Sequence, residues 1–175
     1  MGAGRVKAAV ADAGPLIHLA EIGCLPLLRL FDHLYIPQAI WWETIGQGRV
    51  AEANLLELGN IEKRSPTQIE VDRFVQDNGL GTLHAGECES LYVCRQIGIT
   101  SILTDDLAVR EAAKRLQLTP VGSLGVVIRA YQSEIISLEE AERHILDLQD
   151  VSTLFVTRTI AELAIAELHQ RAPKK

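Results

Sequence analysis

The sequence predicts an α/β fold in which a parallel sheet is covered by helices on both faces. Short apolar runs, rich in β-branched residues, alternate with longer segments in which apolar residues recur at helical spacing. Strands that alternate with helices in this way form parallel sheets joined by right-handed crossovers. Acidic residues also stand where two of the predicted strands end, and parallel sheets carry their functional sites at that edge.

The composition fits one domain with a terminal extension. A chain of 175 residues can bury roughly 70% of its unfolded surface without help from a cofactor or a disulfide. It has 17 Lys and Arg against 23 Asp and Glu, a formal charge of −6, which argues against broad electrostatic adhesion to nucleic acid or anionic membranes. A polyanionic substrate would need local help, such as a bound cation. The odd number of cysteines and the lack of a signal-peptide pattern predict a cytoplasmic protein. No apolar run approaches the ~20 residues of a membrane span, which predicts a soluble one.

The individual elements follow from the apolar pattern and its breaks. The predicted strands are residues 5–11, 33–36, a weak one near 61, 99–103 and an edge strand over 119–123. The predicted helices are residues 15–22, 25–31, 37–45, 51–58, 67–78, 87–97, 107–116 and 124–131, then two more that follow capping boxes at Ser137 and Thr159. We expect residues 1–135 to form the α/β domain and residues 136–175 a C-terminal helical extension packed on it.

Acidic residues recur at positions that the predicted fold brings together. Asp12 follows the first strand, Glu87 begins a helix, and Asp105 and Asp106 follow a later strand. Strand ends and helix starts share the carboxyl edge of a parallel sheet, so these side chains can converge, whereas Glu43, late in a helix, is placed less firmly. Clustered carboxylates must either raise their pKa values or bind a cation, and oxygen ligands without His or Cys favour Mg²⁺ or Mn²⁺.

Each acidic residue also has a purely structural interpretation. Asp105 or Asp106 can cap the helix that begins at Leu107, a role that is compatible with binding a metal. Asp12 can form an Asx turn, Glu87 can interact with the helix dipole, and a single Glu such as Glu43 is more often a solvated helix residue. The case for a metal site depends on their convergence.

Several short motifs, in this order and spacing, resemble those of PIN-domain proteins over residues 6 to about 131. They are Asp12-Ala13-Gly14-Pro15-Leu16-Ile17, Ile36-Pro37-Gln38-Ala39-Ile40-Trp41-Trp42-Glu43, Gly86-Glu87-Cys88-Glu89, Leu103-Thr104-Asp105-Asp106 and Pro120-Val121-Gly122-Ser123-Leu124-Gly125. The resemblance implies a five-stranded parallel sheet and a Mg²⁺- or Mn²⁺-dependent ribonuclease. It also implies RNA as the substrate, a small antitoxin protein as a partner, and a homodimer.

The resemblance assigns roles to individual positions. Asp12 matches the first acidic ligand of the family, Glu43 the second, Glu87 the third and Asp106 the fourth. The family pattern also makes Asp105 an additional metal ligand. Together these five positions form the predicted metal site.

Two further positions support that site. The resemblance makes Thr104 the hydroxyl that orders the turn, and Arg110, one helical turn beyond the aspartates, can hold a carboxylate or a substrate phosphate, with a structural ion pair favoured. Toxin-type relatives usually have Ser or Thr after the first Asp, whereas this chain has Ala13 and Gly14, so its start looks like a separate branch of PIN-like proteins.

The sequence therefore predicts a metal-dependent ribonuclease, with the toxin of a toxin–antitoxin pair as a possible role. The alternative is a catalytically inactive PIN-like module that binds RNA or protein. A third class is a receiver-type phosphotransfer domain, which requires a Lys opposite the acidic strand end, and the sequence offers no convincing one.

Trp41 and Trp42 are expected to pack in the core rather than to stack on a base. The apolar last helix is expected to be core, although its width would also suit a partner surface.

Overall fold

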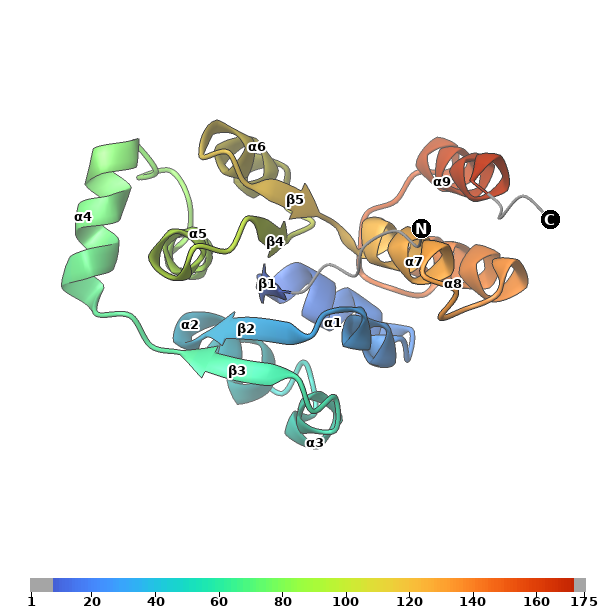
Figure 1. Ribbon diagram of the computed structural model, residues 1–175, viewed down its shortest axis with the longest axis horizontal. Coiled ribbons are helices and arrows are strands. Elements are labelled where there is room, and N and C mark those ends of the chain that lie inside the picture. Colours follow the sequence, from blue (N-terminus) through green and yellow to red (C-terminus); the bar gives the residue numbers. More distant parts are fainter. Residues whose placement is uncertain (1–7, 172–175) are drawn as a thin grey trace.

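A five-stranded, all-parallel sheet forms the centre of the computed structural model, which describes residues 8–171. The strands are β1 (Ala8–Ala11), β2 (His33–Pro37), β3 (Ile61–Arg64), β4 (Ser101–Leu103) and β5 (Thr119–Val121). They lie in the order β3-β2-β1-β4-β5, which Figure 1 shows. This confirms the predicted parallel sheet and its fifth, edge strand. Residues 5–7 of the first predicted strand lie outside the described part of the chain.

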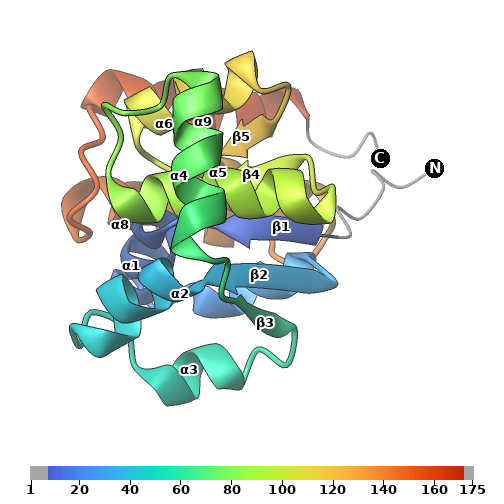
Figure 2. The same ribbon diagram turned by 90° about the vertical axis from the view of Figure 1, so that its left-hand side faces the viewer.

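Helices cover both faces of the sheet, as predicted. Along β1, Ala9 and Ala11 face one hydrophobic cluster while Val10 faces another, because successive strand residues point to opposite sides. The helices on the side of Val10 are α4 (Gln68–Asn78), α5 (Ala85–Ile97) and α6 (Leu107–Arg115), of which α4 and α5 lie in front of the strands in Figure 2. The elements on the other side are α1 (Ala13–Glu21), η1 (Leu25–Leu30), α2 (Gln38–Trp41), η2 (Trp42–Gly46), α3 (Glu52–Leu56), α7 (Ser123–Gln132), α8 (Leu138–Asp150) and α9 (Arg158–Gln170).

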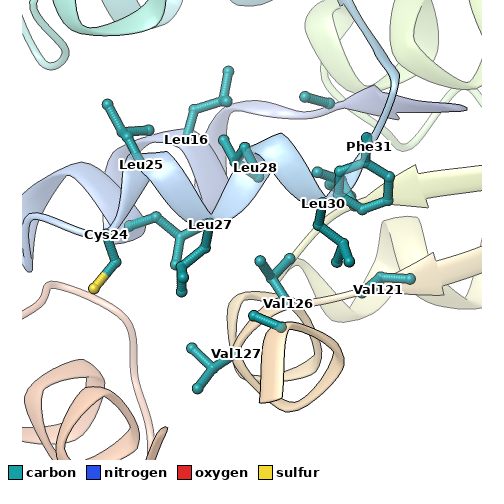
Figure 3. Packing of buried hydrophobic residues seen from close by; sticks show 14 of the residues in the cluster. Leu16, Cys24, Leu25, Leu27, Leu28, Leu30, Phe31, Val121, Val126 and Val127 are labelled. Atoms are coloured by element: carbon teal, nitrogen blue, oxygen red, sulfur yellow. The ribbon is translucent and has the colours of Figure 1, made fainter. Parts of the chain in front are cut away.

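The short element η1 belongs to the hydrophobic cluster on the side of Ala9 and Ala11, where it connects α1 with the other elements. It is a 3₁₀ helix rather than the α-helix that the apolar run suggests, with Pro26 in its first turn. The side chains of Leu27 and Leu30 extend toward Val126 and Val127 of α7, as Figure 3 shows. This contact fixes α7, and therefore the loop that precedes it, against the first helical segments of the chain.

The two C-terminal helices belong to the same hydrophobic cluster. Ile145 of α8 and Leu168 of α9 are fully buried in it. The predicted capping box at Ser137 is present at the start of α8. The box predicted at Thr159 is wrong, because α9 begins at Arg158 and its cap is Thr157, whose hydroxyl accepts a hydrogen bond from the N–H of Ile160.

The helix predicted over residues 37–45 changes its geometry half-way. It begins as α2 and continues as the π-helical turn η2, a type of turn that often occurs at functional sites. Trp41 is half-buried and lies beneath the ammonium group of Lys63, 3.5 Å from the ring centroid. Trp42 is 67% exposed, so the core prediction is wrong for it, because the wider π turn directs its ring outward over Gly46.

Candidate metal centre

The end of β1 and the end of β4 are joined through one hydroxyl group. The backbone N–H of Asp12 donates to the carbonyl of Leu103 at 2.9 Å, which aligns the two strand ends. The Thr104 hydroxyl then donates to Asp12 Oδ2 at 3.0 Å and accepts from the N–H of Asp106 at 3.3 Å. Thr104 is itself fully buried, so it holds Asp12 and Asp106 in a fixed relation.

Asp106 caps α6, which confirms the capping interpretation for one member of the aspartate pair. Its Oδ1 accepts a hydrogen bond from the N–H of Val109 at 3.0 Å. Its other oxygen has no hydrogen-bond partner within the described chain, and the residue is exposed. Capping therefore leaves one oxygen of Asp106 available to a ligand.

Glu43 and Glu87 meet at the beginning of α5. Glu87 is the third residue of α5, and its Oε2 accepts a hydrogen bond from the N–H of His84 at 2.8 Å. Glu43 Oε2 would lie only 3.1 Å from a Cβ on Gly86, so the glycine allows the Glu43 carboxylate to rest against this helix start. Glu89 reinforces the arrangement, because its Oε1 accepts from the N–H of Ala39 in α2 at 3.1 Å. A helix N-terminus favours carboxylates because of the partial positive charge there.

All five predicted acidic residues line one cavity of about 520 Å³, which we call the acidic cavity. Its acidic lining residues are Asp12, Glu43, Glu87, Asp105 and Asp106. Asp12 lies at its base and is 5% exposed, whereas Glu43 and Asp106 are exposed at its rim. The structure thus brings together side chains from four separate segments of the chain.

The electrostatics of this cavity favour a positive charge. The pKa of the Asp12 carboxyl is raised to about 7, chiefly by burial. Hydrogen bonds from the Ala13 N–H and the Thr104 hydroxyl oppose this rise, and the negative charges of Glu87 and Glu43 add to it. Carboxylate oxygens are the ligands that Mg²⁺ and Mn²⁺ prefer. Across residues 8–171, no three His, Cys, Asp or Glu side chains form a group that could hold a metal ion as they stand. What fits a cation here is the donor chemistry and the charge, rather than a preformed coordination shell.

Comparison with known families agrees with this geometry. A family model described as a PIN domain matches residues 8–170, which is nearly the whole chain. The chain belongs to the PIN-domain family. PIN domains are generally nucleases that use divalent metals. No curated protein matched the chain. Within the described residues, no helix combines the length and the apolar character needed to cross a membrane.

In this PIN domain, Asp105 is engaged by the protein itself. Its Oδ1 accepts from the N–H of Ser123 at 2.7 Å, and its Oδ2 accepts from the Ser123 hydroxyl at 2.6 Å and lies 2.8 Å from His18 Nδ1. The sequence did not identify His18 or Ser123 as site residues. The available signal was weak, since His18 is four residues after Gly14 and so shares its face of α1, and Ser123 belongs to a motif of the family resemblance.

Arg110 lies beside the aspartates of the PIN domain without pairing with them. Its Nη1 donates to the carbonyl of Thr104 at 3.2 Å. The favoured prediction of a structural ion pair is wrong for the described residues, where no carboxylate comes within ion-pair distance of Arg110. Its remaining donors therefore stay available to another acceptor.

The loop between α8 and α9 also reaches the site, which the sequence did not predict. Leu154 and Phe155 line the acidic cavity together with Thr153. The Glu21 carboxylate fixes the loop by accepting from the N–H and the hydroxyl of Thr153, at 2.7 and 2.8 Å. Phe155 is nevertheless 87% exposed. An anchored loop therefore presents an aromatic ring at the edge of the PIN-domain site.

Proposed function

We propose that this PIN domain is a metal-dependent endoribonuclease that hydrolyses RNA phosphodiester bonds. In this proposal Asp12, Glu43, Glu87 and Asp106 hold Mg²⁺ or Mn²⁺. The observation that carries the proposal is their convergence on one cavity, with Asp12 buried at its base beside two further carboxylates. A bound divalent ion supplies an activated water and stabilises the charge on the phosphate.

The residues around the four carboxylates have positioning roles in this proposal. Thr104 holds Asp12 and Asp106 through its hydroxyl, and the N–H of His84 orients Glu87. Such outer contacts orient the ligands of metal sites. Asp105, which the sequence also offers as a ligand, has both oxygens engaged by Ser123 and His18. We therefore assign Asp105 to holding the turn in place.

Cleavage of a mixed pool of single-stranded RNA in the presence of Mn²⁺ tests the proposal. D12N and D106N are expected to lose metal-dependent cleavage, since each removes a negative oxygen without changing the volume of the side chain. D150N is the matched control, because Asp150 is an exposed residue at the end of α8, outside the acidic cavity. Retained cleavage by D12N, with the fold intact, would contradict the proposal.

A readout independent of activity is the binding of Mn²⁺ itself. Trp41 and Trp42 precede Glu43 directly, so binding of the ion is expected to change tryptophan fluorescence. E43Q should weaken this titration, while E111Q, which alters an exposed glutamate of α6, should not.

The second candidate function is an RNA-binding module without catalysis. It is favoured by one observation, the absence of a preformed group of three metal-binding side chains in residues 8–171. Such a module would bind RNA without cutting it, and D12N would leave RNA binding unchanged. Mn²⁺ titration together with the cleavage assay therefore separates the two functions.

The partners implied by the family resemblance are part of the same proposal. We propose a homodimer, a cytoplasmic location and a toxin role opposed by a small antitoxin. The supporting surface is on α9, where Ile160 and Leu163 are 44% and 65% exposed. Light scattering is expected to give twice the chain mass of 19.2 kDa. L163E should halve that mass if α9 forms the interface, and an unchanged mass would exclude α9 from it.

A further inference from the structure

A second cavity, of about 650 Å³, continues from the acidic cavity. Asp105, Leu154 and Phe155 line both cavities, so the two form one continuous groove. The second cavity contains Arg110 from α6 and Arg129 from α7, and we call it the arginine cavity. The acidic cavity has no Lys or Arg among its described lining residues. The charge therefore changes sign along the groove.

Arg129 has a polar atom that the described protein does not satisfy. Its Nη1 is buried and has no hydrogen-bond partner among residues 8–171. Burial lowers the pKa of Arg129. A buried donor without a partner costs free energy, and Arg129 lines the arginine cavity, so a shift of its guanidinium group onto an acceptor in that cavity would be favoured.

Arg110 leaves donors unused in the same cavity. Its Nη1 donates a hydrogen bond to the carbonyl of Thr104, and it forms no ion pair with a described carboxylate. Among the described residues that line this cavity, Asp105 is the one acidic side chain, and it is already bonded to Ser123 and His18. Two guanidinium groups without acidic partners match a phosphate, which accepts paired N–H donors from arginine.

The start of α7 strengthens this preference for an anion. The N–H of Ser123, the first residue of this ten-residue helix, already donates to Asp105 Oδ1, while Leu124 and Gly125 of the same first turn line the arginine cavity. The first N–H groups of a helix lack partners within it and attract anions. A Cβ on Gly122 would stand 3.3 Å from Arg110 Nη1 and 2.8 Å from Asp105 Oδ1, so glycine leaves room for both side chains.

We propose that the arginine cavity binds a backbone phosphate of single-stranded RNA, on a nucleotide flanking the bond that the acidic cavity cuts. The inference rests on the proposed ribonuclease function for the position of that bond. Phe155, exposed where the two cavities join, supplies a stacking surface for the adjoining base. The chain carries a formal charge of −6, so such local positive charge is what lets it hold RNA.

The test measures RNA binding without cleavage. A labelled, mixed-sequence 12-mer of single-stranded RNA is titrated with D12N protein in buffer free of divalent ions, and anisotropy is followed at increasing KCl. Adding R110Q and R129Q together is expected to weaken binding about tenfold or more. It should also reduce the slope of log K against log salt by about 0.7, the contribution of the single phosphate that the two arginines are proposed to hold.

The matched control is R73Q/R95Q in the same background. It removes two exposed arginines from α4 and α5, outside both cavities, and changes net charge by the same amount.

F155A should weaken RNA binding several-fold without changing the salt slope, because stacking is not ionic. I69A, which alters another exposed apolar residue, should leave RNA binding unchanged. Urea unfolding verifies the fold. If the double variant unfolds, R110Q alone should still reduce the slope, by no more than about 0.7, whereas R129K, which keeps the charge, should not.

The outcomes separate this inference from the proposed function. If wild-type protein cuts RNA while the R110Q/R129Q variant keeps the slope of its control, the arginine cavity does not bind phosphate and the ribonuclease proposal stands. If binding depends on the arginines but Mn²⁺ supports no cleavage, the cavity binds RNA and the ribonuclease proposal fails. Equal losses in R110Q/R129Q and R73Q/R95Q would overturn the inference.

Discussion

The two cavities that meet at Asp105 differ in how their charges are compensated. In the acidic cavity, burial and, to a smaller extent, the neighbouring carboxylates raise the pKa of Asp12, and no Lys or Arg among the described lining residues balances this negative charge. In the arginine cavity, Arg129 is the uncompensated group, with a buried donor that lacks a partner in the described chain. The comparison shows that the two halves of the groove favour ligands of different charge. The acidic cavity favours a cation, and the arginine cavity favours an anion such as a phosphate.

The largest expected effect comes from Asp12 in the acidic cavity, and it is a loss of protein stability as the pH rises. The pKa of Asp12 is about 7 in the folded chain, whereas the ordinary value for an aspartate, which applies to the unfolded chain, is 3.8. Between these values the folded state keeps a proton that the unfolded state has lost, so metal-free protein becomes less stable from pH 4 to pH 7. Three pKa units correspond to at most roughly 4 kcal/mol.

Urea unfolding at pH 4, 5.5 and 8 without divalent ions checks this expectation. Because Asn does not titrate, D12N should lose less stability across the window and should exceed wild type at pH 8. Parallel curves for the two proteins would show that Asp12 titrates near its ordinary value.

The next effect concerns the residue shared by the two cavities. D105A removes the acceptors of the Ser123 N–H and hydroxyl and of the His18 ring, and it is expected to lower the free energy of unfolding by about 3 kcal/mol. D105N keeps an acceptor oxygen and should lose less. If Asp105 only positions the turn, D105N should bind Mn²⁺ as wild type does, and a loss as large as that of D12N would make it a ligand.

A smaller effect is expected from the hydroxyl that connects the two strand ends. T104V keeps the shape of the side chain but removes the hydrogen bonds to Asp12 and Asp106. Cleavage should fall by roughly 10- to 100-fold, as for other residues that orient metal ligands. RNA binding through the arginine cavity should not change, and T104S should retain most activity. A similar fall in both activity and RNA binding would indicate a general structural defect.

The smallest effect is expected from G122A, which affects both cavities slightly. The added Cβ would be 2.8 Å from Asp105 Oδ1 and 3.3 Å from Arg110 Nη1, so at least one side chain must shift. We expect a loss of about 1 kcal/mol in unfolding free energy together with weaker RNA binding. G81A is the control, because nothing lies within 4 Å of a Cβ at Gly81 and its φ is not left-handed. Equal stability of G122A and wild type would contradict the close packing at this position.

Much of the fold could be predicted because its elements are encoded locally. The apolar run at β4 and the cap at Asp106 are properties of neighbouring residues, and both are present. Local patterns failed where tertiary contacts decide, as at Trp42, whose ring is exposed because the backbone becomes a π turn after α2. Likewise Thr159 had a suitable cap sequence, but the chain placed Thr157 at the start of α9.

For the site, the sequence by itself determined which acidic residues stand at strand ends and helix starts, because parallel connections place those ends on one edge. Glu43 could be placed with them from the sequence only through the family resemblance, and the contact that brings it there, between η2 and the start of α5 at Gly86, is seen only in the tertiary structure. The tertiary structure also decided that Arg129 and Phe155 line one cavity together with Asp105. Such contacts between distant segments depend on packing across the whole core, which no local pattern of residues encodes.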